Sequence, residues 1–92
     1  MGAEPVWHDV SGVGDIRAEL VGVAEQLGGA YRHAGVARAR IAEAVALLAG
    51  LGEQHGAPLV PVELRRAAEE LDRGLGLISG GATAVADIDA RL

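Results

Sequence analysis

The chain has 92 residues, a formal net charge of -5 at pH 7 and an isoelectric point near 5.0. A chain this short forms one domain whose core is small relative to its surface, and a partner subunit is a common source of extra stability. The acidic balance leaves no basic surface for phosphates, so we expect neither nucleic acid nor membrane as a partner. Cysteine is absent, which excludes disulfides and thiolate zinc sites.

The chain carries no visible targeting segment. No basic stretch followed by an apolar core opens it, and its longest uncharged apolar run, residues 44–52, is far shorter than the roughly 18 residues of a membrane-spanning helix. We therefore expect a cytoplasmic chain, with export by a route that needs no signal peptide as the alternative.

Residues 1–11 show no helical period, and Pro5 precedes a short run around Trp7. We predict an extended N-terminal arm here, attached to a helical domain at residues 12–92. Trp7 either folds back as an anchor over the helices or docks on another protein, because one buried Trp can offset much of the cost of ordering such an arm.

A long helix is predicted over residues 12–51, with either Ser11 or Asp15 able to cap its start. Its apolar residues recur at alternating gaps of four and three, the spacing of coiled coils and helix bundles. This apolar seam consists of Ile16, Leu20, Val23, Leu27, Ala30, Ala34, Ala37, Ile41, Ala44, Leu48 and Leu51.

The seam narrows at Ala30, Ala34 and Ala37, which we call the alanine waist. Small residues allow a neighbouring backbone to approach closely, so the waist is a candidate for tight packing against a partner helix. The other interpretation is a flexible kink near Gly28 and Gly29. Beyond the waist the helix is apolar over a wider arc that includes Leu47 and Leu51, and we expect this end to be the best buried.

Glycines and Pro58 mark a reversing loop at residues 52–60, and Pro61 suits the first position of a second helix at residues 61–91. The second helix has its own seam with the same spacing. Its members are Leu64, Ala68, Leu71, Leu75, Ile78, Ala82 and Val85. Asp89 occupies the next seam position, so we expect the last turn to fray or to leave the core.

A second apolar stripe, made of Leu77, Ala84 and Ile88, lies on a different face of this second helix. Two helices that pack as a hairpin bury one face each, so this stripe is predicted to face water until something covers it. An identical subunit is the ordinary solution. The predicted fold is therefore all-α: a two-helix antiparallel hairpin that pairs into a four-helix bundle.

The residues that could carry chemistry are scattered. His8, His33 and His55 fall in the arm, the long helix and the loop, and no Glu-x-x-His motif supports a metal site. The hydroxyl residues have no histidine at helical spacing, and Glu69 and Glu70 lie among arginines as surface ion pairs do. We predict no enzyme, no metal and no cofactor.

In architecture the chain resembles the WXG100 family of ESAT-6-like proteins. The features that carry the resemblance are its length, its two heptad seams and the glycine-bearing turn Gly50-Leu51-Gly52-Glu53-Gln54-His55-Gly56. The family's Trp-x-Gly turn motif and C-terminal Tyr-x-x-x-Asp/Glu signal are absent. The resemblance implies a hairpin that pairs into a four-helix bundle, in a family of proteins exported by type VII secretion that act as effectors or as partners of larger toxins.

The function expected from the sequence is that of a non-enzymatic interaction protein. Its partner is predicted to be a second copy or a similar small helical chain, with a larger protein as a further partner. The candidate partner-binding residues are Trp7, Ala30, Ala34, Ala37, Leu77, Ala84 and Ile88. The alternative is a carrier of a small ligand or metal that uses the alanine waist as a cavity.

Overall fold

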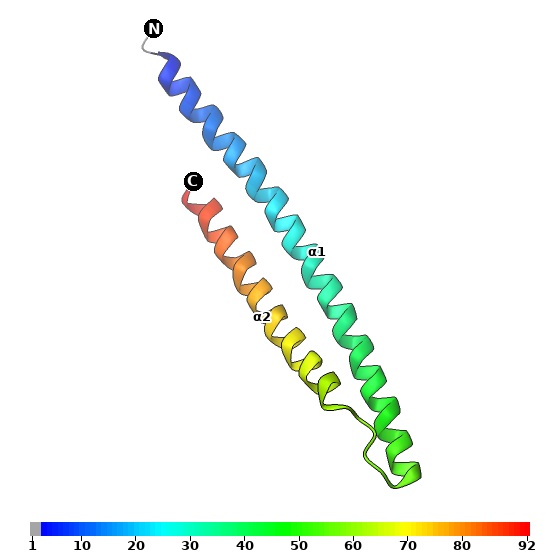
Figure 1. Cartoon of the computed structure of the whole chain (residues 1–92). Helices are drawn as coiled ribbons and strands as arrows, with labels where there is room; N and C mark the ends of the chain where they lie inside the picture. The colour runs from blue at the N-terminus through cyan, green and yellow to red at the C-terminus, as the bar shows by residue number, and fades with distance from the viewer. Residues whose placement is uncertain (1–2) are drawn as a thin grey trace.

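The computed structural model describes the backbone of residues 3–92 and the side chains of residues 12–92. It consists of two helices, α1 (Ala3–His55) and α2 (Val62–Arg91), which pack against each other as an antiparallel hairpin (Figure 1). The predicted all-α hairpin is confirmed. Neither helix has an apolar stretch long enough to cross a membrane within the described residues.

The prediction of an extended arm at residues 1–11 is wrong for residues 3–11, because α1 begins at Ala3. The reason lies in the position of Pro5. The first four N–H groups of a helix have no partner inside the helix, so a proline in the first turn removes no hydrogen bond. Trp7 lies on this helical segment, and its side chain is outside the described residues.

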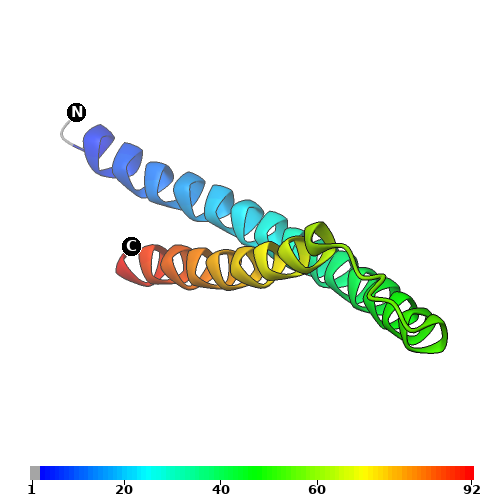
Figure 2. The same ribbon diagram turned by 60° about the horizontal axis from the view of Figure 1, so that its bottom comes forward.

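The hairpin is a rod of 82 × 16 × 14 Å, and its length is set by the 53 residues of α1. Because α2 has only 30 residues, the N-terminal part of α1 extends beyond the end of α2 (Figure 1). The two helices cross at a shallow angle (Figure 2). One end of α1 therefore has no neighbour within the hairpin.

The turn between the helices is built around two glycines. Gly56 has a φ of 65°, the left-handed conformation that commonly ends a helix. The N–H of Ala57 donates a hydrogen bond to the carbonyl oxygen of Gly52 over 3.0 Å, which completes a Schellman motif. Gly52 is the one fully buried residue among residues 12–92.

A side chain at position 52 does not fit. A Cβ added to Gly52 would lie 2.5 Å from the carbonyl oxygen of Ala57, and 3.4 Å from the backbone nitrogen of Leu59. Both are backbone atoms, so relief requires the turn itself to move. Gly52 is thus needed where the chain folds back on α1.

We expect Gly52→Ala to destabilise the protein by about 2 kcal/mol, because overpacking against backbone typically costs that much. Gly50→Ala is the matched control: nothing lies within 4 Å of its added Cβ, and an alanine inside a helix is favoured over glycine by about 1 kcal/mol. Urea unfolding at one protein concentration should move the two midpoints in opposite directions. Equal midpoints would show that the turn is not constrained at Gly52.

The ends of α2 differ in detail from the prediction. Pro61 is the N-cap residue and the helix begins at Val62, one residue later than predicted. Of the two outcomes expected for the last turn, fraying is wrong because the helix continues to Arg91, whereas departure from the core agrees with the exposure of residues 86–92. The Asp89 carboxylate lies 3.9 Å from Arg17. A charged group at this seam position is accommodated because it reaches an arginine of α1.

The seam of α2 faces α1 along its whole length. All seven of its apolar members are half-buried, whereas no apolar side chain is fully buried within residues 12–92. At the turn end of α1, Leu47 is 70% exposed and Leu51 is 45% exposed, so the wide apolar arc predicted to be best buried there is covered only in part. Two helices can cover only one side of each other, and Leu47 lies outside that contact.

Candidate interaction surface

Two ion pairs mark one edge of the contact between α1 and α2. Arg17 lies 3.9 Å from Asp89, and Arg38 donates a 2.8 Å hydrogen bond from Nε to Oδ1 of Asp72. This hydrogen bond and the charge of Asp72 raise the pKa of the Arg38 guanidinium. Arg17 and Arg38 are three heptads apart and so lie on the same flank of α1. We call this side of the hairpin the ion-pair edge.

The seam of α1 is divided between covered and uncovered residues. Its members near the turn, such as Ile41 and Leu48, are half-buried. Ile16, Val23 and Ala30 are exposed. Each of these three residues comes one position before a member of the seven-residue series that contains Arg17 and Arg38. They therefore lie about 100° around the helix from the ion-pair edge. The residues one position later, Arg17, Ala24 and Tyr31, are exposed as well, so α2 leaves both flanks of the seam open in this half of α1.

The uncovered stripe of α2 is where the sequence predicted it to be. Leu77 is 70% exposed, Ile88 is 46% exposed, and Ala84 is exposed as well. Leu77 and Ala84 lie on the side of α2 away from Asp72, as 3.6 residues per turn requires. Since the ion-paired flanks of the two helices meet at one edge, the opposite flanks meet at the other.

The two uncovered stripes therefore form one surface on the same side of the hairpin. The two ion pairs set the register: moving along α1 from Arg17 to Arg38 corresponds to moving back along α2 from Asp89 to Asp72. This register puts Ala30 about level with Ile78, Val23 about level with Ala84, and Ile16 about level with the end of α2 beyond Ile88. We call this surface the open face and define it as Ile16, Val23, Ala30, Leu77, Ala84 and Ile88.

The structure separates the members of the alanine waist. Ala34 and Ala37 are half-buried, whereas Ala30 is exposed. The helix continues through Gly28 and Gly29 without a break, so a kink is not needed to explain these glycines. Of the predicted partner-binding residues whose side chains are described, Ala30, Leu77, Ala84 and Ile88 are exposed.

Several hollows open to solvent along the hairpin. On the ion-pair edge, one of about 330 Å³ is lined by Leu27, Tyr31 and Ile78 among others, and one of about 390 Å³ lies near Arg38 and Val45. These hollows are lined mainly by apolar atoms and follow the groove between the helices. They contain no arrangement of acid, base and nucleophile that would support a reaction.

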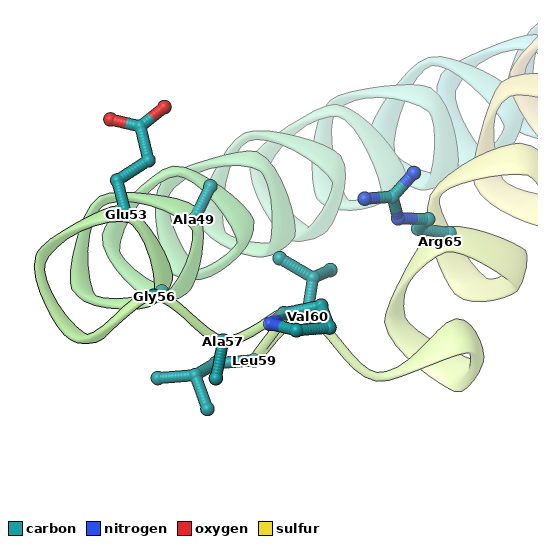
Figure 3. A pocket seen from close by; sticks show the side chains of 9 residues that line it. Ala49, Glu53, Gly56, Ala57, Leu59, Val60 and Arg65 are labelled. Carbon is teal, nitrogen blue, oxygen red and sulfur yellow. The ribbon is translucent and has the colours of Figure 1, made fainter.

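A further hollow of about 380 Å³ lies inside the turn (Figure 3). Val60 points toward α1 there, while Leu59 and Glu53 point outward, and Arg65 closes the side toward α2. Its walls are largely backbone and small side chains. The shape of this hollow follows from the close approach of the loop to Gly52.

The remaining polar residues behave as a solvated surface. Arg73 pairs with Glu70 over 3.0 Å along the exposed side of α2, as the spacing of these charges predicted. His33 and His55 are both exposed. Within the described residues, no three His, Asp or Glu side chains are grouped as metal ligands would be.

Sequence reasoning missed Ile16 and Val23 as surface residues. They follow the seam spacing without exception, and the spacing alone gives no sign that α2 leaves them uncovered. Both residues lie alongside α2, whose last turns reach Arg17, so their exposure follows from where α2 sits on the seam.

Comparisons with protein families, with characterised proteins and with solved structures find no match to this chain. The resemblance to WXG100 proteins therefore rests on the two-helix hairpin alone.

Proposed function

We propose that this chain is a non-enzymatic interaction protein whose hairpin pairs with a second copy through the open face, giving a four-helix bundle. The observation that carries the proposal is the open face itself, whose apolar residues on both helices are exposed to solvent. Contiguous exposed apolar surface is a common mark of a protein interface.

The surface area of the chain supports the same proposal. Its accessible surface is 6942 Å², whereas a compact monomer of 9.4 kDa is expected to expose about 5,000 Å². The excess is comparable to the area that a chain buries in an obligate dimer. A hairpin without a buried apolar residue gains most of its stability from such an interface.

Pairing is the basis for any wider role. The hairpin would suit a small protein that binds a larger one, as the architectural resemblance to WXG100 proteins suggests. Export of the chain from the cell is part of the same proposal. Neither nucleic acid nor a membrane is proposed as a partner.

Linkage between folding and association tests the proposal. When a dimer unfolds to separate chains, its Tm rises with protein concentration. We expect the far-ultraviolet circular dichroism of the chain to show a higher Tm at higher concentration, and helix content to fall on dilution. A Tm that is independent of concentration would contradict the proposal.

A further inference from the structure

We infer that the hairpin opens in two units, and that a level rich in glycine in both helices is the boundary between them. The free half, residues 12–35 of α1 and 74–91 of α2, opens first. The turn half, residues 36–73, stays folded while it does so. The inference concerns a single chain and goes beyond the proposed pairing.

Glycines are concentrated at one level of the rod. Residues 28–35 of α1 contain three of the chain's 14 glycines, and residues 74–81 of α2 contain four. The two ion pairs put these segments level with each other. One hollow is accordingly lined by Gly28 from α1 and by Ile78 and Ala82 from α2. We call this level the glycine zone, and its glycines are Gly28, Gly29, Gly35, Gly74, Gly76, Gly80 and Gly81.

Close packing inside the hairpin does not require these glycines, in contrast to Gly52. A Cβ added to Gly28 or Gly29 would lie 3.5 or 3.8 Å from guanidinium nitrogens of Arg32, an ordinary contact with the end of a flexible side chain. At the other five positions no described atom lies within 4 Å. Each glycine inside a helix lowers the helix-forming equilibrium about fivefold relative to alanine. Both helices are therefore easiest to unfold at the same level.

The cover that α2 gives to α1 changes at this level too. In the turn half both flanks of the α1 seam are half-buried, as Ala37 and Arg38 show. In the free half only the middle of the seam is half-buried, at Leu20 and Leu27, and both flanks are exposed. The free half is thus held by a narrower apolar contact than the turn half.

Polar contacts weaken in the same direction. In the turn half, Arg38 donates a 2.8 Å hydrogen bond to Asp72. In the free half, Arg17 lies 3.9 Å from Asp89, and both side chains are 51% exposed. Such exposed pairs add little stability. The loop also ties the two helices together at the turn end, whereas the other end has no covalent link between them.

Opening of the free half is a local unfolding event. Isolated helices of this length are marginal in water, so the two segments lose helical hydrogen bonds once they separate. Separation also uncovers apolar residues that the closed hairpin half-buries, namely Leu20, Leu27, Ile78 and Val85. Contiguous units that open below the cost of global unfolding are common in proteins, and moving or binding elements are drawn from them.

Amide hydrogen exchange, resolved by residue with NMR, tests the inference on the full chain. The conditions are those in which the exchange rate reports the opening equilibrium. We expect amides of the free half to exchange at least about tenfold faster than those of the turn half, with the change located at the glycine zone.

Two matched variants locate the boundary. Gly50→Ala lies in the turn half and Gly80→Ala in the free half, and no described atom lies within 4 Å of either added Cβ. Position 50 unfolds only in the global event, so Gly50→Ala should slow exchange about fivefold in the turn half and leave the free half unchanged. Position 80 unfolds in both events, so Gly80→Ala should slow exchange about fivefold in both halves.

One exchange rate along both helices, slowed everywhere by either variant, would show a single cooperative opening and overturn the inference. A smooth gradient from the free end, without a change at the glycine zone, would indicate simple fraying and overturn it as well. Light scattering on the same samples reports the pairing separately. A monomer with the expected exchange profile would contradict the proposed pairing and support this inference.

Discussion

Leu77→Glu is expected to dissociate the dimer, with the largest effect of any single substitution on the open face. Leu77 is 70% exposed in the hairpin, so nothing inside one chain opposes the change. In the proposed dimer Leu77 of each chain lies in the interface, and glutamate would place a carboxylate there away from water. The loss of an apolar contact and the cost of burying unpaired charge together amount to about 3 kcal/mol or more, roughly a hundredfold in Kd. Light scattering should then report the mass of one chain.

Val21→Glu is the control for this substitution. Val21 is 56% exposed and lies in the groove on the ion-pair edge, beside Leu20 and Ala86. The change introduces the same charge onto the same hairpin but outside the open face, and the mass should remain that of the parent. If Val21→Glu dissociates the protein while Leu77→Glu does not, the partner binds at the ion-pair edge.

The sequence pattern predicted the hairpin because its signals are local. Seam spacing in both helices, the glycines before the turn and Pro61 at the start of α2 each depend on residues close in the chain. The exposure of Leu77, Ala84 and Ile88 was predicted from the same seam spacing, because these residues lie outside the seam of α2. Their role in binding a partner stays a prediction.

What the sequence did not predict depends on how the two helices meet. A heptad seam shows which residues of α1 are apolar, and gives no information on which flank of the seam α2 covers. Ile16, Val23 and Ala30 are uncovered because α2 lies over the seam residues between the two flanks, such as Leu20, Leu27 and Ala34, which are half-buried. The position of α2 on the seam is a property of the tertiary contact.

The start of α1 was missed for a different reason. Pro5 and the lack of apolar periodicity indicated an extended segment, yet a proline within the first helical turn is tolerated. α2 does not extend alongside this end of α1 (Figure 1).

The most direct test of the account is the mass of the unmodified chain in solution. Multi-angle light scattering at micromolar concentration, combined with circular dichroism of the same sample, reports association and folding together. The account predicts a helical species with twice the 9.4 kDa mass of one chain. A monodisperse monomer with full helix content and a cooperative thermal transition would contradict it, because the open face would then be stable in water without a partner.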